Sequence, residues 1–244
     1  RMDAVTITNL TRETIPLEMK VMEWVRQADG ADHVLTGKPE HGRSVADCIT
    51  LRLDSMELRP LGKTRIPVTL ALPEGFSGEG YAAVAFDRAD RELTDAPDQV
   101  ARRSTRIRAL ASRTGQAAVE LLSFTAQRAP NGVIQFLAPI ANTGDVGIFP
   151  DVSISIQNSE NTEVGRITLP DLRSSLVQAG TERLIRAEHR KILDPGSHTA
   201  LLTIRYGDGS RPLSGRASFV VPESKPEAGE TAQESVLSAS DSTN

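Results

Sequence analysis

Short runs in which apolar and polar residues alternate recur along the whole chain and predict β-strands. Val5-Thr6-Ile7-Thr8-Asn9 is the first of these runs, and it ends at a polar turn, Leu10-Thr11-Arg12-Glu13. The runs are rich in Val, Ile, Leu and Thr, and Gly, Pro, Asn and Asp separate them, whereas helical periodicity is scarce. This pattern is typical of an all-β sandwich. Strands are expected at residues 4–9, 15–25, 49–53, 56–58, 64–72, 80–87, 105–113, 118–126, 134–141, 152–157, 165–169, 182–187, 199–205 and 217–221.

Two stretches of the chain show the same order of features, which indicates a duplicated module. In the first, a strand closes at Asn9, a second strand follows, and Gly62-Lys63-Thr64-Arg65-Ile66 comes later. In the second, a strand closes at Asn142, another strand follows, and Gly180-Thr181-Glu182-Arg183-Leu184 comes later. We therefore expect two tandem β-sandwich domains that meet near residue 115, the first at 1–114 and the second at 115–221.

Three segments lack the strand pattern. Residues 27–47 hold Gly and Pro among mixed charges and are expected to form a loop or a ragged hairpin, and residues 88–99 are rich in Asp and are expected to form a second polar loop. Loops on a sandwich often carry binding sites, but loop length also drifts without function, and both interpretations stay open. Residues 222–244 consist largely of Pro, Glu, Ser, Ala and Thr. Such a segment buries too little apolar surface to fold, so we expect a disordered tail or a linker.

The start of the pattern predicts that the first sandwich lacks its first strand. A strand begins at Ala4, whereas a sandwich module usually has a strand before this one. Arg1-Met2-Asp3 leads into it without a charged region and an apolar core, so no signal peptide is recognised. The strand at 4–9 should then expose one edge, and we expect edge-strand pairing with another molecule.

Charge and cysteine content restrict the class of protein. Lys and Arg total 28 against 32 Asp and Glu, so the net charge is −4 and a nucleic-acid partner is not expected. Cys48 is the single cysteine, so there is no intrachain disulfide and no Cys-based zinc motif. No run of apolar residues reaches the length that spans a membrane, so no transmembrane segment is expected.

No group of residues forms a recognisable catalytic or metal site. The four histidines have no metal-ligand spacing and are expected to be structural or on the surface: His33, His41, His189 and His198. A hairpin near 151–163 carries several oxygen-bearing residues, but it lacks the regular ligand spacing with a glycine turn that calcium loops show. Trp24 is expected to be a half-buried sandwich residue rather than a recognition aromatic. We therefore expect no enzyme activity, no cofactor and no metal.

An arginine cluster at the junction of the two modules is the strongest candidate for binding. Residues 101–113 contain five arginines and no acid: Arg102, Arg103, Arg106, Arg108 and Arg113. Beside an interdomain cleft, guanidinium groups would suit a carboxylate, which Arg binds through two hydrogen bonds. The same charges would also protect an exposed edge strand from aggregation. The sequence leaves both interpretations open.

In the order of these motifs, the chain resembles the periplasmic pilus-assembly chaperones. The resemblance covers nearly all of residues 4–221 and rests on 5–9 with Pro16 and Trp24, and on 56–66, 80–86, 105–110, 140–144 and 199–207. It implies two immunoglobulin-like domains set in an L, an edge strand that binds an incomplete pilin subunit, and basic residues that hold the subunit's C-terminal carboxylate. Arg108, or failing that Arg106, matches one such basic residue. Upstream of it the family has alternating large apolar residues, whereas this chain has Gln99, Ala101 and Arg103.

The sequence thus predicts two tandem immunoglobulin-like β-sandwich domains and a disordered tail. The function expected from the resemblance is that of an extracytoplasmic, chaperone-like protein, periplasmic or on the cell surface, that assists assembly of a pilin-like or secreted protein partner. Its partner-binding residues would be Arg103, Arg106, Ile107 and Arg108. The alternative is a structural module, in which tandem sandwiches serve as spacers in a cell-surface or adhesive protein.

Overall fold

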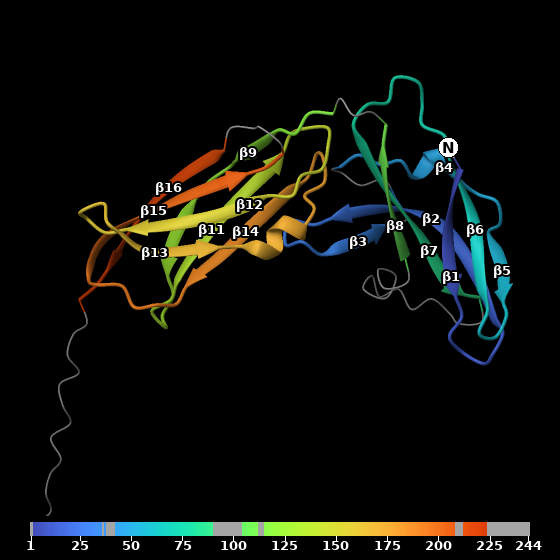
Figure 1. Cartoon of the computed structure of the whole chain (residues 1–244), viewed down its shortest axis with the longest axis horizontal. Helices are drawn as coiled ribbons and strands as arrows, with labels where there is room; N and C mark the ends of the chain where they lie inside the picture. Colours follow the sequence, from blue (N-terminus) through green and yellow to red (C-terminus); the bar gives the residue numbers. More distant parts are fainter. Residues whose placement is uncertain are drawn as a thin grey trace, which may run out of the picture.

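The computed structural model describes residues 2–35, 37, 42–89, 104–111, 115–207 and 212–223, and these form a two-part, nearly all-β molecule (Figure 1). The first part contains β1 (Met2–Thr8), β2 (Ile15–Arg26), β3 (Asp32–Leu35), β4 (Ile49–Leu51), β5 (Ser55–Leu58), β6 (Lys63–Leu70), β7 (Glu79–Arg88) and β8 (Ser104–Leu110). The second contains β9 (Val119–Leu121), β10 (Thr125–Arg128), β11 (Ile134–Asn142), β12 (Asp151–Gln157), β13 (Glu163–Thr168), β14 (Glu182–His189), β15 (Gly196–Arg205) and β16 (Leu213–Val221). Two short 3₁₀ turns, Ala46–Cys48 and Pro170–Ser174, are the helical elements of the described residues.

Two antiparallel sheets make up the first sandwich. One has the order β1-β6-β4, and the other has the order β3-β2-β7-β8, with β5 paired to β2. Strand β7 is the centre of this sandwich, because its residues from Glu79 to Asp87 are all buried. The flanking strands alternate instead: in β6, Ile66 and Val68 are buried while Arg65 and Thr69 are exposed, as expected for strands with one face in the core.

The second sandwich has the same two-layer plan. Its sheets have the orders β10-β11-β14, with β9 also paired to β11, and β13-β12-β15-β16. The inward residues of β11, β12 and β15 alternate strictly with outward ones and meet in one apolar core, which includes Phe136, Ile140, Ile154 and Leu202. The all-β fold of two tandem immunoglobulin-like sandwiches, predicted from the sequence, is confirmed.

The structure also changes some expected element bounds. Of the two forms expected for the segment 27–47, the structure has the hairpin: the four-residue strand β3 lies in this segment and pairs antiparallel with the end of β2. The strand expected at 118–126 is two strands. Leu121 and Thr125 are four residues apart, while their partners Ile140 and Leu137 on β11 are three apart, so one extra residue interrupts the pairing.

Some expected segments lie outside the described residues. These are most of the polar segment 88–99, residues 112 and 113 of the expected strand 105–113, and residues 224–244 of the expected tail. The predicted domain bounds, the predicted lack of a first strand and the disorder of the tail therefore stay predictions.

Candidate functional site: the domain junction and the groove beside β8

A buried carboxylate at the start of β7 is the centre of the domain junction. Glu79 accepts hydrogen bonds from Arg108 Nε at 2.7 Å, from the Tyr81 hydroxyl at 2.8 Å and from the Gly147 amide, in the second sandwich, at 3.0 Å. Burial by itself would raise the pKa of Glu79, but hydrogen bonds from Arg108, Tyr81 and Gly147 outweigh it, so this pKa is lowered. Glu79 therefore stays ionised and links β7, β8 and the second sandwich.

Two further side chains join the sandwiches at this junction. The Tyr81 hydroxyl accepts a hydrogen bond from the Ala179 amide at 3.2 Å, and burial is the main cause that raises the pKa of Tyr81. Buried Gln178 accepts from the Arg26 amide at 2.8 Å and donates to the Trp24 carbonyl at 3.3 Å. These polar groups are buried, so they cannot exchange their hydrogen bonds for bonds to water. The contacts therefore fix the bend between the sandwiches seen in Figure 1.

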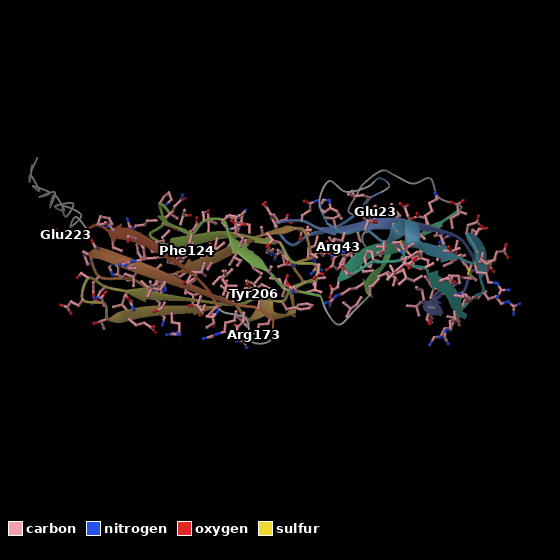
Figure 2. The ribbon with its side chains drawn as sticks, turned by 90° about the horizontal axis from the view of Figure 1, so that it is seen from above. Glu23, Arg43, Phe124, Arg173, Tyr206 and Glu223 are labelled. Atoms are coloured by element: carbon pink, nitrogen blue, oxygen red, sulfur yellow. The ribbon has the colours of Figure 1, made fainter. Side chains whose placement is uncertain are left out.

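The outer edge of the same junction is held by Arg43. Figure 2 shows this side chain between the two sandwiches. Its guanidinium donates to the Asp145 carbonyl at 3.4 Å and lies 5.2 Å from the centre of the Phe76 ring. Close by, the Glu79 amide donates to the same Asp145 carbonyl at 2.7 Å. The junction thus extends from the start of β7 to the loop before β12.

Strand β8 presents its predicted binding residues on two faces. Ile107 points inward and packs against the core clusters of the first sandwich, while Arg106 and Arg108 point outward. Arg106 Nη2 lies 2.6 Å from Asp32 Oδ2, and its guanidinium lies 5.8 Å from the centre of the Trp24 ring. The Arg108 guanidinium pairs with Glu79 and lies 5.5 Å from the centre of the Phe149 ring.

The two arginines differ in the charge that surrounds them. Asp32 is shared, because it also accepts a hydrogen bond from Arg26 Nε at 2.8 Å, so two guanidinium groups face one carboxylate. Burial would raise the pKa of Asp32, but the bonds from Arg26 and Trp24 and the charge of Arg106 lower it. Arg108 has Glu79 as a partner of its own. The group of Arg26, Arg106 and Asp32 therefore has one more positive charge than negative. Within this group, the Arg106 side chain is 46 % exposed.

The structure brings three of the four predicted site residues together. Arg106, Ile107 and Arg108 lie on β8, and Arg103 lies outside the described residues. Their acidic partners, Asp32 and Glu79, were not among the site residues predicted from the sequence. Both acids lie far from β8 in the sequence, and the only local signal was a charged residue at the start of a strand. The partner-binding role of the four residues stays a prediction.

A groove lies between β1 and β8, which are edge strands of the two sheets of the first sandwich. Among the described strands, β1 pairs only with β6 and β8 pairs only with β7. Two hollows of about 670 and 520 Å³ follow this gap, and Val5 and Thr105 line both. The floor is made of core side chains: Ile7, Leu17, Ile49, Leu58, Val68, Leu70, Phe86 and Ile107. The charged residues among the described lining are all arginines: Arg88, Arg106 and Arg108.

Three of the oxygen-bearing residues near the β12–β13 hairpin bind partners within the protein. Asp151 accepts two hydrogen bonds from Arg173 at 2.9 Å, and Glu163 pairs with Arg166. The Asn158 side chain accepts from two amides of its own turn. Across the described ranges, no group of three or more His, Cys, Asp or Glu is placed to hold a metal ion. The described part of the chain also contains no helix with the length and apolar character needed to cross a membrane.

The chain matches no protein-family model and no curated protein. Solved structures do match along most of its length. One, a chaperone–tip adhesin complex of CFA/I fimbriae biogenesis, is 11 % identical, covers 89 % of this chain and 92 % of its own, and has a TM-score of 0.47. The class 5 fimbriae chaperone CfaA is 12 % identical, with the same coverage and a TM-score of 0.45.

A third match is the CsuC–CsuE chaperone–tip adhesion subunit complex of the archaic chaperone-usher Csu pili of Acinetobacter baumannii. It is 8 % identical, covers 88 % of this chain and 90 % of its own, and has a TM-score of 0.39. All three are fimbrial or pilus chaperones or complexes that contain one, the class of protein that the sequence resembles.

Proposed function

We propose that this protein is a non-enzymatic, chaperone-like assembly factor that holds an extended segment of an extracytoplasmic protein partner along β8. The groove between β1 and β8 is the observation that carries this proposal. Each bordering strand is the last described strand of its sheet on this side, and core side chains line the gap between them. A partner strand laid there would supply backbone hydrogen bonds along one edge and apolar side chains at alternate positions.

The lining of the groove defines the chemistry of this segment. Val5 and Ile107 pack against both core clusters of the first sandwich and still line the groove, so they would receive β-branched or other apolar side chains. Both bordering strands are seven residues long, so a segment of similar length fits. The charged lining is cationic, which favours a segment that carries an acid or ends in a free carboxylate.

We assign the carboxylate contact to Arg106 rather than to Arg108. Arg106 shares Asp32 with Arg26, so its cluster keeps a net positive charge. Arg108 is matched one to one by Glu79, and removing it would leave a buried carboxylate without its cation. Arg106 would therefore bind the partner, and Arg108 would mainly support the domain junction. A periplasmic or cell-surface location is part of the same proposal.

A selection from random seven-residue peptides with free C-termini tests the proposal, and it does not require the partner to be identified first. We expect enriched peptides to alternate apolar residues and to end in, or contain, a carboxylate. Bound peptide should slow amide hydrogen exchange in β1 or β8 and leave β13 and β16 unchanged. Arg106→Ala should weaken binding by about 2–5 kcal/mol.

The control variant is Arg216→Ala, which removes an exposed arginine from β16, an edge strand of the second sandwich. It should bind peptide as the wild type does. Enrichment of no peptide pattern, or protection confined to the second sandwich, would refute strand binding at β8. A thermal melt of each variant shows whether lost binding reflects lost folding.

A second candidate function, a rigid spacer in a surface protein, is favoured by the domain junction. Glu79, Tyr81 and Gln178 fix the two sandwiches through buried hydrogen bonds, as a spacer would require. A spacer does not need an open groove, so the same selection distinguishes the two functions.

A further inference from the structure

Two turns of the first sandwich lie side by side at its end farthest from the second sandwich, at the lower right of Figure 1. One turn connects β1 to β2 and contains Leu10, and the other connects β5 to β6 and contains Leu61. The Asn9 amide donates to the Gly62 carbonyl at 2.8 Å, and the Leu61 amide donates to the Thr11 carbonyl at 2.9 Å. These backbone bonds make the two turns one surface, which we call the leucine tip (residues 9–13 and 59–63).

The leucine tip presents two apolar side chains to solvent. Leu10 is 83 % exposed and Leu61 is 66 % exposed. Single exposed leucines are common on protein surfaces, but these two come from turns that are bonded to each other. Leu61 also has φ +52°, in the left-handed region that glycine and asparagine occupy more readily. A leucine kept in that conformation with its side chain in water indicates a role for the side chain.

A buried asparagine keeps the tip in one conformation. Asn9 is 2 % exposed, and its side-chain amide donates to the carbonyls of Glu13, Leu58 and Arg59 at 2.8, 3.2 and 3.1 Å. Its side-chain oxygen accepts from the Thr11 amide at 2.9 Å. Because one side chain bonds to both turns, the leucines are held in a fixed position before any contact is made.

The charge of the tip is opposite to that of the whole chain. Arg12, Arg59 and Lys63 are exposed cations of the tip, and Glu13 is its only acid, whereas the chain as a whole has a net charge of −4. A convex, cationic surface with protruding leucines needs no matching pocket in what it binds. The interface of a lipid bilayer can bind such a surface, because leucine side chains insert at the boundary of the acyl chains while the cations stay at the level of the lipid phosphates.

We propose that the leucine tip docks the protein on the surface of an anionic lipid bilayer. Leu10 and Leu61 would insert into the interface, and Arg12, Arg59 and Lys63 would contact the lipid phosphates. Docking would be weak and salt-dependent, because it uses two short apolar side chains and three exposed charges. Leu10 also lines the hollow at one end of the groove beside β8, whereas Leu61 does not line either hollow. The docking does not depend on the function proposed above.

Flotation of the full chain with vesicles tests the docking. The probes are vesicles of phosphatidylcholine with about 30 % phosphatidylglycerol, and vesicles of phosphatidylcholine alone. We expect binding to the anionic vesicles only, and its loss in about 500 mM salt. The double variant Leu10→Asn with Leu61→Asn should bind at least about tenfold more weakly. Asparagine tolerates positive φ, so this variant should keep the wild-type melting temperature.

A matched control removes another exposed apolar residue. Ile192 is fully exposed on the second sandwich, and Ile192→Asn should float as the wild type does. Failure of the wild type to bind anionic vesicles, or equal losses in the control and the double variant, would overturn the proposal. Binding that survives the double variant would assign the contact to charge alone and would also overturn it. Capture of a protein ligand by the tip in the absence of vesicle binding would assign it to a protein partner instead.

Discussion

Two asparagines form equivalent side-chain hydrogen bonds at matching positions of the two sandwiches. Asn9 follows β1, and its amide bonds to carbonyls of its own turn and of residues 58 and 59. Asn142 ends β11, and its amide bonds to the carbonyls of Val146 and Val177 at 2.9 and 3.0 Å. In both, the side-chain oxygen accepts from the amide two residues later. A repeated sequence motif thus corresponds to a repeated turn.

Replacing Asn142 should reveal how much this turn contributes to stability. Asn142→Ala removes three hydrogen bonds of a buried side chain, each worth about 0.5–1.5 kcal/mol, so we expect a loss of about 2–4 kcal/mol. Urea denaturation followed by circular dichroism measures the free energy of unfolding. Asn158→Ala is the control, because Asn158 caps only its own surface turn, and its cost should stay below about 1 kcal/mol. Equal losses in both variants would contradict the assigned role.

At the scale of elements, β8 combines three tasks in seven residues. Its inward Ile107 packs against the core, its outward Arg108 supports the junction, and the strand borders the groove as the edge of its sheet. This is possible because alternate residues of a strand point to opposite faces while its backbone edge stays available. By contrast, residues 224–244 contain few bulky apolar residues that could pack in a core.

Removing residues 224–244 should leave stability unchanged. The segment contains few bulky apolar residues, so its deletion is expected to change the free energy of unfolding by no more than about 0.5 kcal/mol. Paired thermal and urea melts of the full and shortened chains measure this difference. A loss of several kcal/mol would mean that the segment adds a strand to the fold.

In the whole molecule, the ionised Glu79 side chain links the two sandwiches through its hydrogen bond from the Gly147 amide. Its pKa is lower in the folded protein than in the unfolded chain, where a glutamate has a pKa of about 4.3. The stabilisation from this shift is therefore complete above about pH 5 and is lost as the pH falls through the folded-state pKa. Acid should weaken the domain junction before it unfolds either core.

The variant Glu79→Gln tests this dependence. It should cost about 1–3 kcal/mol at pH 7, because the buried partners lose a charged acceptor, and it should lose less further stability than the wild type on acidification from pH 5. Urea denaturation at a series of pH values gives both quantities. Glu188→Gln, in the exposed pair with Arg190, should leave the profile unchanged. Parallel profiles for Glu79→Gln and the wild type would rule out the proposed role of Glu79.

The fold class, the duplication and most strand positions could be predicted from the sequence. Each of these depends on local information, since the alternation of residues such as Val5-Thr6-Ile7-Thr8 and the turn at Asn9 can be read within a few positions. The short strand β3 and the break between β9 and β10 could not be read this way. Both depend on pairing with a strand elsewhere, β2 in one case and β11 in the other.

Which side chains meet at the candidate site could be learned only from the packing of the folded chain. The arginines of β8 were visible in the sequence, but their partners Asp32 and Glu79 lie on β3 and β7, at separations that no local pattern encodes. The groove likewise required knowing that β1 and β8 are edges of opposite sheets on the same side of the sandwich. The alternation of apolar and polar residues shows which face of a strand is apolar. Which neighbour covers this face depends on the packing of the whole chain.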